Sequence, residues 1–90
     1  MLNFYIHKNP RDLLKELSVN ARTLRKERKW SQEEMARRAN MSLGSYKRFE
    51  QSGQISLESL LKIAFVFDRL NEFEGIFLPS EAKPSEKLFN

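Results

Sequence analysis

Two short segments with helix-start and helix-stop signals, only three residues apart, constrain the fold of this chain more than any other feature. The first opens with the capping box Ser31-Gln-Glu-Glu34 and ends at Asn40, a residue that tolerates a left-handed backbone. The second opens at Ser42 and closes at Ser52-Gly53. This spacing is the helix-turn-helix geometry, although short serine-capped helices also occur in purely structural bundles.

A long helix is expected before this pair. In Asn9-Pro10 the asparagine is a capping residue and the proline suits the first helical position. Apolar residues then recur at spacings of four, four and three, so the helix should end near Arg28. Weak helix formers predict a break near Ser18. We therefore predict an N-terminal arm and leading helix over residues 1–18, followed by the helix-turn-helix domain over residues 19–78.

Two more helices are expected after the pair. One begins at Ser56 and is apolar on nearly every side, which predicts a position central to the core. The other is short, from Asn71 to about Phe77, and Pro79 stops it. Residues 79–90 are charged and rich in small side chains, which indicates a flexible tail. The elements together predict an all-α, compact domain of five helices.

Composition excludes several classes of function. The 90 residues include no cysteine, which excludes a disulfide framework and a thiolate metal site. His7 is the only histidine, so one chain holds neither a histidine metal cluster nor a catalytic triad. No catalytic spacing of polar residues is recognisable, and we expect neither enzymatic activity nor a cofactor. No bilayer-spanning stretch or secretory signal is present, which predicts a cytoplasmic, nucleoid-associated protein without a membrane partner.

Positive charge is concentrated in one third of the sequence. The chain carries a net charge of +4, but residues 22–48 alone contain nine basic and three acidic side chains, a net charge of +6. A focused basic region attracts phosphate polyanions and speeds encounter with them. Taken alone, the same charge also fits an ordinary solvated face.

Four segments between Val19 and Leu70 carry a shared pattern. They are Arg22-Thr-Leu-Arg-Lys-Glu-Arg28, Ser31-Gln-Glu-Glu-Met-Ala-Arg-Arg-Ala-Asn-Met-Ser42, Tyr46-Lys-Arg-Phe-Glu-Gln-Ser-Gly53 and Leu60-Leu-Lys-Ile-Ala64. Together these segments resemble the XRE (lambda-repressor-like) helix-turn-helix family, and the resemblance implies a lambda-repressor-like fold. The chain departs from the family pattern where Asn40 and Trp30 stand in place of glycine, and where Ser56 stands in place of proline.

The resemblance also implies roles for single residues. The helix opened by Ser42 is expected to lie in the major groove, where Arg48 suits guanine and Lys47 suits guanine or phosphate. Leu43 is placed to touch a thymine methyl group. Ser42 and Gln32 lie at helix N-termini, where a phosphate is the expected partner. The residues expected to bind DNA are Gln32, Ser42, Leu43, Gly44, Ser45, Lys47 and Arg48.

Other polar and aromatic residues are expected to be structural. The family resemblance implies that Arg25 and Glu50 form an ion pair that ties the first helix to the third. Tyr46 and Phe49 are three residues apart and point to the same side of their helix, so we interpret them as core residues rather than base-stacking groups.

The partners implied by the resemblance are double-stranded DNA with a pseudo-palindromic operator and a second copy of the chain, as in a dimeric transcriptional repressor. Residues 56–90 resemble antitoxins of the HipB type, which accompany kinase-like toxins of the HipA type. Phe4-Tyr-Ile6 and Leu88-Phe89 are candidate apolar anchors. Two alternatives stay open: a stand-alone or phage-type repressor without a toxin, and a protein–protein adaptor with a degenerate helix-turn-helix.

Overall fold

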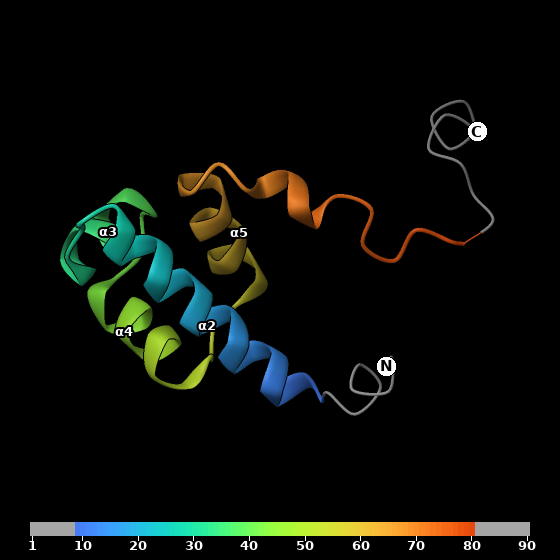
Figure 1. Cartoon of the computed structure of the whole chain (residues 1–90), viewed down its shortest axis with the longest axis horizontal. Coiled ribbons are helices and arrows are strands. Elements are labelled where there is room, and N and C mark those ends of the chain that lie inside the picture. The colour runs from blue at the N-terminus through green and yellow to red at the C-terminus, as the bar shows by residue number, and fades with distance from the viewer. Residues whose placement is uncertain (1–8, 81–90) are drawn as a thin grey trace.

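The structure is a computed structural model that describes residues 9–80, and all of the regular secondary structure in this range is helical (Figure 1). As expected, the described part contains helices and no strand. The four α-helices of this range are α2 (Pro10–Glu27), α3 (Gln32–Arg38), α4 (Leu43–Ser52) and α5 (Leu57–Val66). One 3-10 turn, η1 (Leu70–Phe73), follows them.

The expected fifth helix over residues 71–77 is therefore wrong. The structure has only the short turn η1 there, followed by irregular backbone. Gly75 and Phe77 both adopt left-handed backbone angles, with φ of 85° and 68°, and these angles interrupt a right-handed helix.

The break predicted near Ser18 is also wrong, because α2 is continuous through this position. The side chain of Ser18 is buried, and its hydroxyl donates to the carbonyl oxygen of Lys15 at 2.7 Å. Packing against the rest of the domain thus overrides the low helix propensity of this stretch. The boundary that we predicted between residues 18 and 19 falls inside α2, and our predictions for Phe4-Tyr-Ile6, His7 and Leu88-Phe89 lie outside the described residues.

Side-chain caps begin the four α-helices at the positions that the sequence indicates. In each case a side-chain oxygen accepts a hydrogen bond from the backbone N–H three residues later, at 2.8 to 3.1 Å. These bonds satisfy one of the four N–H groups that a helix start leaves without a partner. The capping residues are Asn9, Ser31, Ser42 and Ser56.

Each α-helix also ends at a residue with a left-handed backbone. After α3 this residue is Asn40, as expected, and after α4 it is Gly53. After α2 it is Lys29, at φ 60°, so the position that requires conformational freedom lies one residue before Trp30, where we had placed the family glycine. After α5 it is Asp68. These residues turn the chain sharply and keep the connections short.

The core lies where α4 packs against α2 and α3. Its fully buried side chains are Met35, Tyr46 and Phe49, so the interpretation of the two aromatic residues as core agrees with their burial. Trp30 extends this core toward α5, because its ring stacks on Phe67 with 6.2 Å between centroids.

The expectation that α5 lies at the centre of the core is only partly right. Ile63, Ala64 and Phe67 at this helix and its end are buried. Leu57 and Phe65 are 67% and 71% exposed, so the opposite side of α5 is apolar but uncovered.

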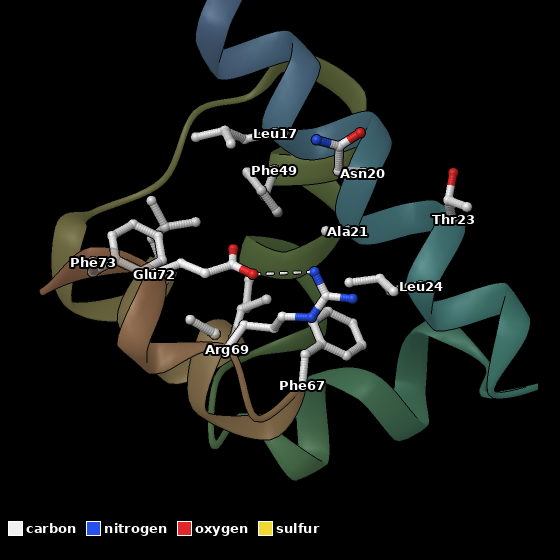
Figure 2. A pocket seen from close by; sticks show the side chains of 13 residues that line it. Leu17, Asn20, Ala21, Thr23, Leu24, Phe49, Phe67, Arg69, Glu72 and Phe73 are labelled. Atoms are coloured by element: carbon white, nitrogen blue, oxygen red, sulfur yellow. Dashed lines mark hydrogen bonds and ion pairs between the residues drawn. The ribbon is translucent and has the colours of Figure 1, made fainter.

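A hollow of about 320 Å³ lies between α2, α5 and η1 (Figure 2). Apolar side chains line it, including Leu17, Leu24 and Phe73, and Arg69 and Glu72, which form an ion pair at 3.1 Å, line it as well. None of the helices in residues 9–80 is long and apolar enough to cross a membrane.

Replacing glycine by alanine is expected to change the free energy of unfolding in opposite directions at Gly44, within α4, and at Gly53, which ends it. At Gly53 a methyl group would lie 2.9 Å from the backbone carbon of Leu14, and φ is 83°. We expect Gly53→Ala to lower the free energy of unfolding by more than about 1 kcal/mol. At Gly44 the same methyl group meets no atom within 4 Å, and Gly44→Ala should raise that free energy by up to about 1 kcal/mol. Urea denaturation followed by circular dichroism measures both, and equal effects would contradict this account.

Candidate DNA-binding surface

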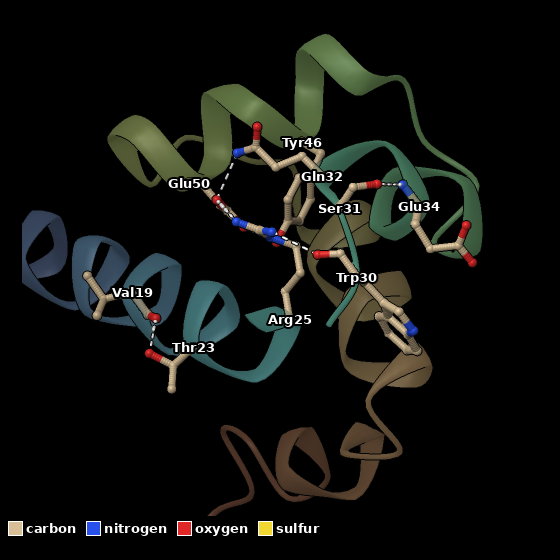
Figure 3. Close-up of polar contacts among 9 residues, drawn as sticks. All are labelled: Val19, Thr23, Arg25, Trp30, Ser31, Gln32, Glu34, Tyr46 and Glu50. Atoms are coloured by element: carbon tan, nitrogen blue, oxygen red, sulfur yellow. Dashed lines mark hydrogen bonds and ion pairs between the residues drawn. The ribbon is translucent and has the colours of Figure 1, made fainter. Parts of the chain in front are cut away.

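The carboxylate of Glu50 is the centre of a polar network that joins three helices (Figure 3). Arg25 donates to it twice, from Nε to Oε2 at 2.7 Å and from Nη2 to Oε1 at 3.1 Å. Gln32 donates from Nε2 to Oε1 at 2.8 Å, and the hydroxyl of Tyr46 donates to Oε2. The structure therefore brings the expected partners Arg25 and Glu50 together and adds two further donors.

The third nitrogen of the Arg25 guanidinium, Nη1, also takes part in this network. It donates to the carbonyl oxygen of Trp30 at 2.9 Å, so the guanidinium also holds the connection between α2 and α3. The side chains of Arg25 and Glu50 are only 10% and 4% exposed. Among the residues that the structure describes, no buried side-chain nitrogen or oxygen lacks a hydrogen-bond partner, so the network is fully satisfied.

The network shifts the pKa of its members. Burial alone works to raise the pKa of Glu50, but hydrogen bonds from Arg25, Tyr46 and Gln32 outweigh it and hold this pKa below its ordinary value. Burial, followed by the hydrogen bond to Glu50, raises the pKa of Tyr46. The hydrogen bond to Glu50 raises the pKa of Arg25. At neutral pH the network therefore consists of one anion, one cation and two neutral donors.

One face of α4 is left uncovered by this packing. Gly44, Lys47, Arg48 and Gln51 are all exposed, and separations of three, four and seven residues place them on the same side of a helix. We call these four residues the outer face of α4. Within residues 9–80, neither Lys47 nor Arg48 forms an ion pair, so both cations remain available to a ligand.

Two polar hollows flank the outer face of α4. The Arg22 hollow adjoins Gln51, and it is lined by Arg22, Arg25, Lys26, Gln32, Glu50 and Gln51. The Ser56 hollow adjoins Arg48, and it is lined by Met41, Ser45, Arg48, Gln54, Ile55, Ser56 and Ser59. The outer face is thus a ridge with a polar depression along each side. A helix that enters the major groove meets the two phosphate backbones on its two sides, and this arrangement offers polar groups to both.

The residues expected to bind DNA fall into two groups in the structure. Gly44, Ser45, Lys47 and Arg48 lie on the exposed part of α4, and Leu43 is half-buried at its start. The other two are engaged with protein partners, and their contacts with phosphate stay a prediction. Gln32 donates to Glu50, whereas the hydroxyl of Ser42 accepts from the N–H of Ser45 and donates to the Ser45 hydroxyl at 2.9 Å.

Sequence reasoning missed three residues that belong to this surface. Gln51 lies on the outer face of α4, one turn beyond Lys47 and Arg48. Arg22 and Lys26 come from α2, are exposed, and line the Arg22 hollow. Their membership in the basic region of residues 22–48 was the available signal, but the sequence did not show which of its cations share a face with α4. Over the described residues 9–80, no group of three or more metal-ligating side chains is assembled.

A helix-turn-helix unit with an uncovered, basic second helix is the arrangement of a DNA-binding domain. The profile of the helix-turn-helix family matches residues 22–70, which is more than half of the chain. The chain therefore belongs to the XRE-type helix-turn-helix family. Comparison with curated proteins and with solved structures gives no significant match.

The lowered pKa of Glu50 predicts a pH dependence of stability. Because Glu50 binds its proton more weakly in the folded state, its contribution is present above the ordinary glutamate pKa of about 4.3 and is lost as the pH falls below it. We expect Glu50→Gln to be less stable at pH 7, by about 3–5 kcal/mol, because it leaves Arg25 without its buried counter-charge. The variant should then lose less stability than the wild type between about pH 5 and pH 3.

Urea denaturation at a series of pH values measures this difference. Other carboxylates titrate in both proteins, including Glu34, whose pKa is lowered by the hydrogen bond from Arg37. The difference between the two pH profiles therefore isolates Glu50. Parallel profiles for the two proteins would contradict the role assigned to its carboxylate.

Proposed function

We propose that this protein is a sequence-specific transcriptional repressor that binds an operator through the outer face of α4. The observation that supports this most is that two cations, Lys47 and Arg48, lie on an exposed helix face between two polar hollows and form no ion pair with any residue that the structure describes. An α-helix fits the major groove, and arginine or lysine on such a helix donates to the O6 and N7 atoms of guanine.

The proposal assigns different tasks to the ridge and to the hollows. Arg48 and Lys47 read base edges, Gln51 is suited to adenine, and Gly44 lets the backbone approach the groove closely. Arg22 and Lys26 neutralise backbone phosphates, which gives affinity and fixes the register without reading sequence. In this proposal the protein has no enzymatic activity and acts in the cytoplasm, in contact with the chromosome.

Repression follows from occupancy of a promoter by two copies of the chain. A dimer binds two half-sites about one helical turn, ~34 Å, apart, so its operator is pseudo-palindromic. The rival proposal, a protein–protein adaptor that has lost DNA binding, has less support, because it leaves the cations of the outer face without a role.

The test is fluorescence anisotropy with duplex DNA from upstream of the protein's own gene, beside a scrambled duplex, at two salt concentrations. We expect tighter binding to the native duplex that persists at the higher salt concentration. The double variant Lys47→Ala/Arg48→Ala should lose at least about 30-fold in affinity for the native duplex, because each of the two lost base contacts costs about 1–3 kcal/mol.

The matched control is Arg11→Ala/Lys15→Ala. It removes two exposed positive charges from the N-terminal half of α2, whereas Arg22 and Lys26 of the proposed surface lie toward its C-terminal end. This control should weaken binding only slightly and equally for both duplexes. Unchanged binding by a folded Lys47→Ala/Arg48→Ala variant would show that α4 does not read the operator. Absence of binding by the wild type at low salt would favour the adaptor.

We further propose that this repressor is the HipB-like antitoxin of a toxin–antitoxin pair and binds a HipA-like kinase toxin. Ile76, Phe77 and Leu78 support a protein partner of this kind, because they follow one another on irregular backbone and are 54%, 97% and 45% exposed. Contiguous exposed apolar side chains mark sites of protein interaction. A stand-alone repressor has no evident use for them.

Co-expression with the protein encoded beside this gene tests the antitoxin role. If the neighbour is kinase-like, we expect the two proteins to co-purify and expect Ile76→Ser/Phe77→Ser/Leu78→Ser to abolish this while operator binding persists. Val19→Ser, which also replaces an exposed apolar residue, should co-purify normally. A neighbour unrelated to kinases, or a kinase-like neighbour that does not co-purify with the wild type, would leave the stand-alone repressor as the better description. Co-purification that survives the triple change would instead show that the toxin binds another surface of this chain.

A further inference from the structure

The side of α5 that faces away from the core is apolar and uncovered. Leu57, Leu61 and Phe65 recur at intervals of four residues, so they form one line along the helix. Leu57 and Phe65 are largely exposed, and Leu61 is half-buried. We call these three residues the outer face of α5. A monomeric protein rarely leaves such a line of large apolar side chains in water, which indicates that something covers it.

A hollow of about 520 Å³ adjoins this face. Leu61, Phe65 and Leu70 supply its apolar wall, and the end of α3 at Arg38, Ala39 and Asn40 supplies the other side. The molecule therefore has both protruding side chains and a depression of suitable chemistry on the same surface. A large apolar side chain from a partner can enter this depression without any rearrangement of the backbone.

The charges beside the outer face of α5 are also of both signs. Glu58 is exposed and Lys62 is half-buried, and both line the same hollow. The ammonium group of Lys62 lies 3.4 Å from the carbonyl oxygen of Asn40, which orients it along the rim. Neither residue takes part in an ion pair among the described residues.

We infer that the outer face of α5 binds the same face of a second copy of this chain, with the two α5 helices antiparallel. Antiparallel pairing about Leu61 places Leu57 of one copy against Phe65 of the other. The same arrangement brings Glu58 of one copy beside Lys62 of the other, twice over. The inference rests on the proposed function only for the dimer's purpose, because the contact itself is a property of the free protein.

A second copy fits this surface better than an unrelated partner does. A two-fold contact uses the same patch on both subunits, so the patch has to complement itself. The outer face of α5 meets this condition in shape, with protrusions beside a hollow, and in charge, with one acid and one base four residues apart. Since α5 follows α4 after the short connection of residues 53–56, this pairing would also set the separation of the two α4 helices.

Sedimentation velocity of the free protein over a wide range of concentration tests the inference without DNA. We expect a monomer–dimer equilibrium in the wild type. Phe65→Glu should weaken dimerisation at least about tenfold, because it places a charge in each of the two apolar contacts between Phe65 of one copy and Leu57 of the other. Val19→Glu is the matched control, since Val19 is an apolar side chain 59% exposed on α2, and it should dimerise as the wild type does. Circular dichroism confirms the helix content of each variant.

Mixing two charge variants tests the antiparallel register. Glu58→Lys alone and Lys62→Glu alone should each form weaker homodimers, because like charges then meet across the axis. A mixture of the two variants restores both opposite-charge contacts and should form a heterodimer that is tighter than either homodimer. This comparison does not depend on Phe65 and reports directly on which residues face one another.

The outcomes separate this inference from the proposed function. A wild type that stays monomeric, equal dimerisation of Phe65→Glu and wild type, or a mixture no tighter than its components would each overturn the α5 contact. The same Phe65→Glu protein is then measured against a single operator half-site. Half-site binding equal to that of the wild type supports the α5 inference, because the lost dimerisation then comes from a face separate from α4.

Discussion

The buried carboxylate of Glu50 is the constraint on which the arrangement of the first three helices depends. A charge with almost no contact with water requires a counter-charge and full hydrogen bonding, and here the donors come from α2, α3 and α4 itself. Moving any one of these helices would leave a buried charge incompletely paired. The apolar core supplies most of the driving force, but this single group selects one mutual orientation of the helices.

That orientation determines what α4 can present to a ligand. Tyr46 and Glu50 lie one helical turn apart, so anchoring both turns the opposite side of α4 outward with Lys47 and Arg48 on it. Gln32 illustrates how closely structure and binding surface are linked. It completes the Glu50 network and at the same time lines the Arg22 hollow. A change at Gln32 would therefore disturb the support of α4 and the surface beside it together.

Local rules predicted those features that depend only on neighbouring residues. The capping serines and the left-handed Asn40 belong to this class, because a cap or a turn is decided within a few residues. The unbroken course of α2 at Ser18 does not, since the burial of this side chain in the folded domain cannot be read from its neighbours in sequence. Apolar spacing also predicted a helix over residues 71–77, where the extended Glu74 and the left-handed Gly75 and Phe77 leave only the turn η1. Arg22 and Gln51 were missed because only packing decides which faces stay uncovered.

Trp30 gives the molecule an internal optical reporter, because it is the only tryptophan of the chain. Its indole is stacked on Phe67 and covered by the guanidinium of Arg38, 4.2 Å from the ring centre. These contacts join the start of α3 to the end of α5 across the domain. The emission of one fluorophore therefore follows the docking of α5 onto the helix-turn-helix pair, whereas far-ultraviolet dichroism follows total helix content. A detachment of α5 that preserves its helicity would be visible as a difference between the two signals.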